Sequence, residues 1–412
     1  MNADELIYDW NTVEDTPAPK HAIEFDDETL RDGLQCPSVT NPTIEQKIRL
    51  LHLMDELGIQ YANVGLPGAG KHVVEVVTRL VEEIRDAGLK IKPNCAARTM
   101  EVDIRPVAEI TQKTGVPIEV SMFIGSSQIR AYTEDWGLDT MLKHSVAALE
   151  FAEKEKLPVM FVTEDTTRAH PRTLDALYGA ALDHGAQRLC FCDTVGHAIP
   201  QGVVSLMRFA RSLVDKSGRG DVKIDWHGHM DRGLGVPNAI AALQAGAHRV
   251  HGTGLGVGER AGNCPMDILL ANLKLEGWID NDLTKLGEYV ALTSEATGIP
   301  IPVSYPIFGR DAFETGTGVH AAAVIKALEK GEDWLADRVY SGVPAGLFGL
   351  RQNIRVGPMS GKSNVVWWLQ QHGYEASDDR VERLFQAAKA SRKLLEDHEL
   401  HELAGTKAAA ST

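Results

Sequence analysis

The stretch Ile224-Asp-Trp-His-Gly-His229 carries the most information about the fold, because an apolar strand pattern ends there in two histidines one residue apart. Alternate side chains of a β-strand point to the same face, so His227 and His229 should emerge side by side. Two parallel imidazoles at a strand end can form half of a metal site. Hydrogen-bonded or exposed histidines are the other interpretation, so the pair needs support from the rest of the chain.

Outward from this stretch, short apolar runs alternate with amphipathic helical segments between about residues 22 and 276. The strand candidates are centred on Ile23–Phe25, Tyr61–Val64, Leu89–Pro93, Ile118–Met122, Val159–Thr163, Arg188–Cys192, Val222–Trp226 and Arg249–Gly254. The helix candidates between them include Thr43–Leu57, Lys71–Ala87, Asp139–Glu155 and Pro200–Val214. Eight strands, each followed by a helix, predict an α/β fold of the (β/α)₈ TIM-barrel type; a doubly wound open sheet is the alternative.

Polar residues favour the barrel, because they cluster at or just after the predicted strand ends. They are Arg31-Asp32, Glu164-Asp165, Asp193-Thr194, His227 with His229, and Glu259 to Asn263. The carboxyl ends of all strands share one face of a barrel, and barrel active sites are built there. An open sheet would gather such residues only near one switch point.

The sequence changes character after Glu276, where helical segments follow a Pro-rich linker at residues 298–306. The expected helices are Leu283–Thr297, His320–Gly331, Ser360–Gln371 and Asp378–His398. We therefore expect an N-terminal arm over residues 1–20, a barrel over 21–280, helical C-terminal subdomains over 281–403 and a flexible tail over 404–412.

Composition limits the classes of partner. The formal net charge of -15 argues against a nucleic-acid or anionic-membrane partner, because both require basic patches. No segment approaches the roughly 20 apolar residues that span a bilayer. The five cysteines form no CxxC pair, and the acidic N-terminus resembles neither a signal nor a transit peptide. A cytoplasmic protein with reduced thiols is the expectation.

The barrel face offers ligands for a divalent cation. We predict Asp32, His227, His229 and Asn263 as ligands; mixed oxygen and nitrogen donors fit Zn²⁺, Mn²⁺ or Mg²⁺ equally well. Taken singly, Asp32 also fits a turn before Gly33, and Asn263 also fits a helix cap.

Such a metal would chelate a 2-oxo acid and polarise its ketone. Arg31 would then lie beside the developing alkoxide, although a structural ion pair is its simpler role. Glu164 ends a strand and should face inward, where it can transfer protons, orient a second substrate or cap the next helix.

Several motifs of this chain resemble those of a known family. Three stretches, Asp27-Glu-Thr-Leu-Arg-Asp-Gly-Leu-Gln35, the His-x-His strand and Gly256-Val-Gly-Glu-Arg-Ala-Gly-Asn263, are similar to those of the DRE-TIM metallolyase superfamily. This superfamily includes 2-isopropylmalate, homocitrate and citramalate synthases and 3-hydroxy-3-methylglutaryl-CoA lyase. Thr163-Glu-Asp-Thr-Thr-Arg168 and Cys192-Asp-Thr-Val-Gly196 also resemble the synthases, so the resemblance covers roughly residues 22 to 371.

The resemblance implies a role for each matched position. It implies metal binding by the four predicted ligands, contact of Arg31 with the ketone, contact of Thr194 with the substrate carboxylate, and acetyl-CoA activation by Glu164. Gln35, in the same motif as Arg31, is expected to bind substrate. The stretch Thr315-Gly-Thr-Gly-Val-His320 resembles a segment whose histidine enters the partner subunit's active site, and Tyr340 matches a supporting tyrosine. A homodimer with an exchanged C-terminal region is therefore expected.

Two departures from the family pattern matter. Leu34 stands where synthases usually have Glu, which is a feature of the lyase branch. The lyases, however, lack the Gly-Glu-Arg-x-Gly-Asn run and the helical second region, so the synthase interpretation is preferred. At 412 residues the chain also leaves no room for a C-terminal leucine-sensing domain, so a short form without that regulatory domain is expected.

Strand parity bears on which 2-oxo acid is bound. If Glu164 points into the barrel, so do Val162 and Met160; if Thr194 does, so do Cys192 and Cys190. These side chains are apolar or weakly polar and offer no cation for a second substrate carboxylate.

Lysine-pathway homocitrate synthases carry an arginine at the position of Met160, and its absence favours an aliphatic substrate. Against this, the loop at residues 125–130 resembles that of homocitrate synthase, and Arg98 or Arg130 could supply a cation. The expected reaction is condensation of acetyl-CoA with 2-oxoisovalerate to 2-isopropylmalate, with homocitrate or citramalate synthase activity, or a CoA lyase, as alternatives.

Overall fold

The computed structural model describes residues 3–12 and 18–405, so the predicted arm over 1–20 and tail over 404–412 lie partly outside the described residues. The chain separates into two compact units, residues 1–282 with 288–300, and residues 283–287 with 301–412. The division at residues 300–301 falls inside the Pro-rich segment. The predicted domain limits stay predictions.

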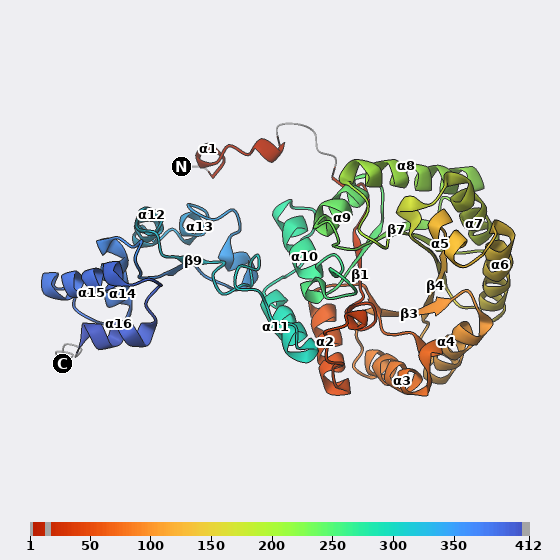
Figure 1. Ribbon diagram of the computed structural model, residues 1–412, viewed down its shortest axis with the longest axis horizontal. Helices are drawn as coiled ribbons and strands as arrows, with labels where there is room; N and C mark the ends of the chain where they lie inside the picture. The colour runs from red at the N-terminus through yellow and green to blue at the C-terminus, as the bar shows by residue number, and fades with distance from the viewer. Residues whose placement is uncertain (1–2, 13–17, 406–412) are drawn as a thin grey trace. The chain divides into compact units, whose positions relative to one another are not determined.

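The first unit is a closed barrel of eight parallel strands in chain order, as the sequence predicted (Figure 1). The strands are β1 (Glu24–Asp27), β2 (Tyr61–Asn63), β3 (Lys92–Arg98), β4 (Glu119–Gly125), β5 (Val159–Glu164), β6 (Arg188–Asp193), β7 (Lys223–Gly228) and β8 (Arg249–Gly252). The barrel closes where β1 pairs with β8, in the register that places Phe25 beside Val250.

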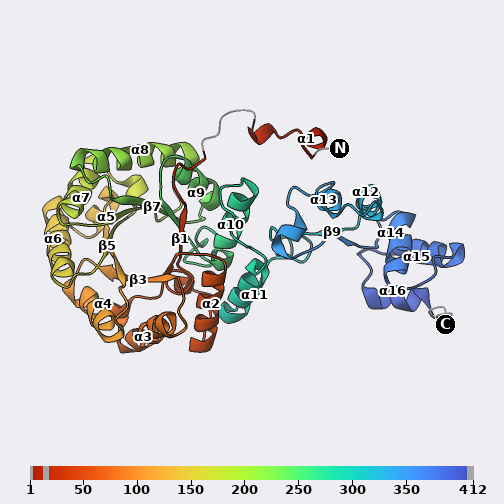
Figure 2. The ribbon, with the colours of Figure 1, turned by 180° about the vertical axis from the view of Figure 1, so that it is seen from behind.

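Helices surround these strands, as both ribbon views show (Figures 1 and 2). They are α2 (Ile44–Glu56), α3 (Lys71–Asp86), α4 (Glu101–Thr114), α5 (Gln128–Thr133), α6 (Leu138–Lys154), α7 (Pro171–Asp183), α8 (Pro200–Ser217), α9 (Gly235–Gln244) and α10 (Met266–Leu275). A short helix α1 (Ala3–Leu6) precedes the barrel, and one-turn 3₁₀ segments interrupt the loops as η1 (Trp10–Thr12), η2 (Gly33–Gln35), η3 (Pro67–Ala69), η4 (Thr166–Arg168) and η5 (Gly254–Gly256).

Strand β6 shows how the sequence pattern builds the barrel. Its alternate residues Leu189 and Phe191 are fully buried, and Phe191 stacks on Tyr178 of α7 with ring centroids 4.4 Å apart. The other set, which includes Cys190 and Cys192, faces the barrel interior and lines its cavity. This period of two fixes which residues reach the site.

Strand β3 runs to Arg98, well past the predicted end at Pro93. The apolar pattern missed this half of the strand because Asn94 faces a polar interior. Its amide Nδ2 donates to Asp26 at 2.8 Å, and its Oδ1 accepts from Ser121 at 3.0 Å. A buried polar residue is tolerated in a strand when its hydrogen bonds are made in this way.

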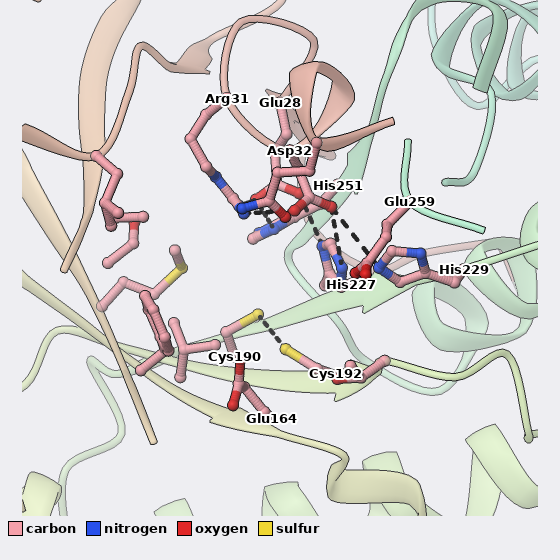
Figure 3. Close-up of a pocket in the computed structure, with 18 residues that line it drawn as sticks. Glu28, Arg31, Asp32, Glu164, Cys190, Cys192, His227, His229, His251 and Glu259 are labelled. Atoms are coloured by element: carbon pink, nitrogen blue, oxygen red, sulfur yellow. Dashed lines mark hydrogen bonds and ion pairs between the residues drawn. The ribbon is translucent and has the colours of Figure 1, made fainter. Parts of the chain in front are cut away.

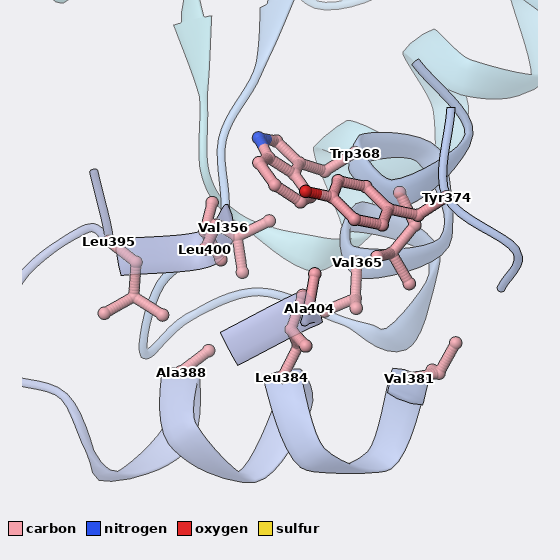
Figure 4. Packing of buried hydrophobic residues seen from close by; sticks show 11 residues of the cluster. Val356, Val365, Trp368, Tyr374, Val381, Leu384, Ala388, Leu395, Leu400 and Ala404 are labelled. Atoms are coloured by element: carbon pink, nitrogen blue, oxygen red, sulfur yellow. The ribbon is translucent and has the colours of Figure 1, made fainter. Parts of the chain in front are cut away.

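The second unit contains the remaining helices and a two-stranded parallel sheet. Its elements are α12 (Gly318–Glu329), α13 (Asp333–Ala336), η6 (Ala345–Phe348), α14 (Lys362–Gln371), α15 (Asp378–Ala390), α16 (Asp397–Ala404), β9 (Glu314–Thr315) and β10 (Asn353–Ile354); α11 (Leu286–Thr297) lies mostly in the first unit. Trp368, Leu369 and Leu384 belong to a buried core that α14, α15 and α16 share (Figure 4).

The predicted single helix Asp378–His398 is wrong, because the structure has two helices there, α15 and α16. Ser391 adopts an extended backbone, and its hydroxyl donates to the Lys393 carbonyl at 2.7 Å. Serine side chains that bond to nearby backbone groups compete with helix formation. Glu396 then caps the start of α16 through a reciprocal pair of bonds with Glu399.

Among the residues that the structure describes, no helix is long and apolar enough to cross a membrane.

Candidate active site

A cavity of about 150 Å³ opens at the carboxyl ends of the barrel strands (Figure 3). Its lining brings together most of the residues that the sequence singled out. They are Arg31, Asp32, Gln35, Met160, Val162, Glu164, Cys190, Cys192, Thr194, His227 and His229. The same lining contains Glu28, Leu66, Ala96, Ser121, Phe123, His251 and Glu259.

Asp32, His227 of β7 and His229 just after β7 form a compact ligand group. The Nε2 atoms of His227 and His229 lie 3.8 and 3.7 Å from Oδ2 of Asp32. One ligand atom from each residue lies within 4.8 Å of the other two. All three residues are buried, with exposed fractions of 5–8%.

Asn263 reaches this group because the loop after β8 folds back against the end of β7. His229 and Asn263 pair as an antiparallel bridge, and the Cys264 N–H donates to the Gly228 carbonyl at 3.0 Å. Gly262 makes the turn with φ of 93°, and a Cβ there would come within 2.0 Å of the Gly256 carbonyl oxygen. The glycines of this run are therefore required by the close approach of the backbone.

The Asn263 side chain completes the group. Its Nδ2 donates to Oδ2 of Asp32 at 2.7 Å, and its buried Oδ1 has no hydrogen-bond partner within the described chain. The two ends of an amide are exchangeable by a flip, so Oδ1 can turn toward Asp32 and its histidines when a cation binds.

Glu28 connects the ligand group to two positively charged side chains, Arg31 and His251. Its Oε2 lies 2.8 Å from Nδ1 of His227, and its Oε1 accepts from Arg31 at 2.9 Å and lies 3.3 Å from Nδ1 of His251. Arg31 also donates to Oδ1 of Asp32 at 2.5 Å. A carboxylate on the far nitrogen of a ligating imidazole fixes the ring orientation and leaves the other nitrogen for the metal.

These contacts set the protonation of the histidines. Burial lowers the pKa of His227, but the Glu28 carboxylate outweighs it and raises that pKa to about 9. Burial also lowers the pKa of His251, but the carboxylates of Asp225 and Glu28 outweigh it and raise that pKa to about 10. Burial and the neighbouring His227 lower the pKa of His229 to about 4. Because ligating imidazoles must be neutral, metal binding here would release a proton from His227.

The residues present fit a divalent metal. Imidazole nitrogens and carboxylate oxygens bind such ions at about 2.0–2.2 Å, so two donors on one ion can be nearly 4 Å apart, as the Asp32 and histidine donors are. The buried Oδ1 of Asn263 has no hydrogen-bond partner within the described chain. Unpaired buried polar atoms are rare and call for a missing partner.

Glu164 at the end of β5 and Thr194 just after β6 are polar residues of the same lining. Burial raises the pKa of Glu164, while the guanidinium groups of Arg130 and Arg31 act in the opposite direction. The Thr194 hydroxyl accepts from the Asp165 N–H at 2.8 Å, which leaves its own hydrogen free to donate into the cavity. Both side chains meet the cavity as strand parity predicted.

The apolar wall consists of Met160, Val162, Cys190 and Cys192, which pack together as one cluster. Beneath it lies Arg249, whose guanidinium is fully buried and lies 2.9 Å from Sδ of Met160. Arg249 is paired with Asp225 and with Glu119, each at 2.6 Å. The charges below the wall therefore compensate one another.

Four predicted site residues lie outside this cavity lining, and one of them is Asn263, which reaches the site through its bond to Asp32. Arg98 pairs with Asp103 through two bonds of 2.7 and 2.9 Å, so its guanidinium is held at the start of α4. His320 and Tyr340 belong to the second unit, where their rings stack at 4.2 Å and line a separate pocket.

Sequence reasoning missed Glu28 and His251 as parts of the site. Glu28 stands in the quoted motif but precedes the residues to which a role was assigned. His251 lies within β8 rather than after it, two residues from the interior Arg249. The available signal is the period of two in strands, which places the side chains of both Glu28 and His251 inside the barrel.

Comparisons with known proteins identify the family of this chain. A model of the HMGL-like family matches residues 22–292. A homocitrate synthase, AksA, from Methanopyrus kandleri is 31% identical over 92% of this chain and 89% of its own length. A probable 2-isopropylmalate synthase from the same organism is 30% identical over 89% of this chain and 69% of its own length.

Solved structures share the fold. A 3-hydroxy-3-methylglutaryl-CoA lyase from Bacillus subtilis superimposes with a TM-score of 0.57 at 20% identity, covering 69% of this chain and 97% of the lyase. At this identity the likeness shows the fold alone. The family model covers the barrel, and the synthases align along most of this chain. With the motifs described above, these matches show that this chain belongs to the HMGL-like (DRE-TIM) family of enzymes.

Proposed function

We propose that this protein is an acyltransferase that condenses acetyl-CoA with 2-oxoisovalerate to form 2-isopropylmalate and free CoA. One observation carries the proposal: the Asp32–His227–His229 group and an apolar wall face the same cavity. The only guanidinium or ammonium group in the described lining is that of Arg31, which is committed to Glu28 and Asp32.

A divalent Zn²⁺, Mn²⁺ or Mg²⁺ ion held by Asp32, His227, His229 and Asn263 would polarise the ketone of the bound 2-oxo acid. Arg31 stabilises the negative charge that develops on the ketone oxygen. Its Nε lies buried and has no hydrogen-bond partner within the described chain, so one N–H remains available for that oxygen. Thr194 and Gln35 hold the substrate carboxylate.

Glu164 accepts a proton from the methyl group of acetyl-CoA, and its raised pKa suits a base that works near neutral pH. The methyl carbon then bonds to the ketone carbon, and the ketone oxygen takes up a proton. Water hydrolyses the thioester, which releases CoA with its free thiol. The balance is one acetyl-CoA, one 2-oxo acid and one water consumed for each 2-substituted malate and CoA.

His320 and Tyr340 complete the active site of a second copy of the chain in this proposal. Their stacked rings share a pocket with Thr315, Thr317 and Ser341, which are hydrogen-bonding side chains. The functional species is a homodimer in which each second unit serves the partner's barrel.

The choice of 2-oxoisovalerate rests on the cavity wall. Relatives named homocitrate synthase and 2-isopropylmalate synthase have nearly equal identities of 31% and 30%. A second substrate carboxylate needs a cation, yet Arg98 is bound to Asp103, Arg130 to Glu134 and Arg249 to two carboxylates. Burying a carboxylate against Met160 and Val162 without such a partner would be costly.

The test is a substrate panel in which release of free thiol from acetyl-CoA is followed with each 2-oxo acid and each metal. We expect the highest kcat/KM with 2-oxoisovalerate, and the product should have the mass of 2-isopropylmalate. Faster turnover of 2-oxoglutarate or pyruvate would replace the substrate with that of homocitrate or citramalate synthase. Because Leu34 resembles the lyase branch, 3-hydroxy-3-methylglutaryl-CoA is included, and its cleavage without any condensation would overturn the proposal.

A further inference from the structure

Two cysteine thiols lie side by side in the wall of the active-site cavity. Cys190 and Cys192 are alternate residues of β6, and their Sγ atoms are 3.8 Å apart (Figure 3). Both line the cavity, although only 1% and 4% of their surfaces are exposed. The proposed condensation gives the two sulfur atoms no chemical role beyond packing.

We propose that Cys190 and Cys192 form a two-sulfur binding site for a soft, thiol-seeking ion such as Zn²⁺ or Cd²⁺, separate from the Asp32–His227–His229 site. The observed spacing carries this inference. Two sulfur atoms at about 2.3 Å from one tetrahedral ion are about 3.8 Å apart. The Sγ atoms therefore already have the separation that such an ion requires.

A disulfide bond fits this pair less well. It would bring the sulfur atoms to about 2.05 Å and the two Cβ atoms to about 3.5–4.5 Å. Residues i and i+2 of a strand are separated by about 6.6 Å along it, and their Cβ atoms point the same way. The hydrogen-bonded pairing of β6 with both β5 and β7 opposes the backbone movement that would close this gap.

The surroundings favour a soft ion over a hard one. Met160 and Val162 pack against the two cysteines, so sulfur atoms are the donors that this apolar cluster offers. Thiolates select soft and borderline ions, whereas oxygen ligands select Mg²⁺ and Ca²⁺. Binding exchanges two S–H bonds for two bonds between sulfur and metal, releases two protons, and needs no oxidant.

An ion on this wall would take the space of the substrate's aliphatic group. That consequence rests on the proposed function, because it assumes that the 2-oxo acid packs against Met160 and the cysteines. A soft ion should then inhibit competitively with the 2-oxo acid. The binding itself does not depend on the reaction, so it can be tested without any substrate.

The experiment is a Cd²⁺ titration of the full chain saturated with Mg²⁺, followed by the ultraviolet charge-transfer absorption of thiolate-bound cadmium. The Asp32, histidine and Asn263 ligands contain no sulfur and cannot give this band. We expect one Cd²⁺ per chain to give the band, with release of two protons. Cys190→Ser and Cys192→Ser should each weaken it at least tenfold in apparent affinity.

Cys36→Ser and His229→Ala are the matched controls, and both should keep the band. Cys36 is the one partly exposed cysteine, whereas Cys95 and Cys264 are buried. Phenylarsine oxide, which bridges paired thiols, should add once to the wild type and not to Cys190→Ala, as measured by intact mass. The proposal is overturned if no band forms, or if the band persists in folded variants that lack either cysteine. A band without inhibition would keep the site but count against 2-oxoisovalerate packing on this wall.

Discussion

Replacing Glu28 by Gln should weaken metal binding although none of the proposed ligands changes. The Glu28 carboxylate lies 2.8 Å from Nδ1 of His227 and 2.9 Å from Arg31. A hydrogen bond to a charged group contributes about 1.5–3 kcal/mol, and a neutral one contributes about 0.5–1.5 kcal/mol. The difference of about 1–2 kcal/mol at His227 corresponds to an affinity about 5- to 30-fold lower. This figure is the pH-independent affinity, referred to neutral His227, because Glu28 also favours the proton that competes with the metal. Changes to groups that orient metal ligands typically cost about 10- to 100-fold.

The assay is competition for Zn²⁺ or Mn²⁺ between the metal-free protein and a chromogenic chelator, supported by calorimetry. Glu119→Gln is the matched control. Like Glu28→Gln it removes a buried carboxylate, but Glu119 is paired with Arg249 and contacts no proposed metal ligand. The control should lose stability and keep its metal affinity. Unchanged metal affinity in a folded Glu28→Gln protein would refute the orienting role of Glu28.

Further predictions concern pH, metal and assembly. Burial raises the pKa of Asp27 to about 6 from 3.8, so the folded chain holds this proton more tightly than the unfolded chain. The stability that protonated Asp27 contributes is therefore present below about pH 4, and about 3 kcal/mol of it is lost as the pH rises toward 6. In urea unfolding at several pH values, Asp27→Asn should remove this loss. Identical pH profiles of unfolding free energy for the wild type and Asp27→Asn would contradict the prediction. A chelator should lower the melting temperature of the wild type but not of His229→Ala, whose metal content by elemental analysis should be near zero; full content would exclude that ligand. Mixing inactive His320→Ala with inactive Arg31→Ala should restore part of the activity through hybrid dimers, and no recovery after proven subunit exchange would count against the exchanged arrangement.

The barrel was predictable because its signals are local. Alternating apolar residues mark each strand, and the polar residues after the strand ends indicated which face carries the site. Asp32, His227 and His229 meet as expected because the ends of β1 and β7 lie at the same mouth of the barrel. The period of two also placed Met160, Val162, Cys190 and Cys192 on the cavity wall correctly.

The remaining features depend on contacts that sequence patterns do not encode. Arg98 follows the inward parity of β3, yet the nearby Asp103 carboxylate binds its guanidinium instead. In the sequence, the charges of Arg249 and Asp225 interrupt two apolar strands, because their ion pair forms only when β7 and β8 lie side by side. His251 is a similar case, because it pairs with Asp26 of β1 and Asp225 of β7.

The most direct test of a metal and a 2-oxo acid in one cavity is nuclear magnetic relaxation of 2-oxoisovalerate on the Mn²⁺-loaded protein. A paramagnetic ion at Asp32, His227 and His229 should shorten the relaxation times of the substrate's methyl protons. We expect this effect to saturate with substrate, to be displaced by 2-isopropylmalate and to be absent in His229→Ala. No enhancement in a wild-type protein with full Mn²⁺ content would contradict the shared site.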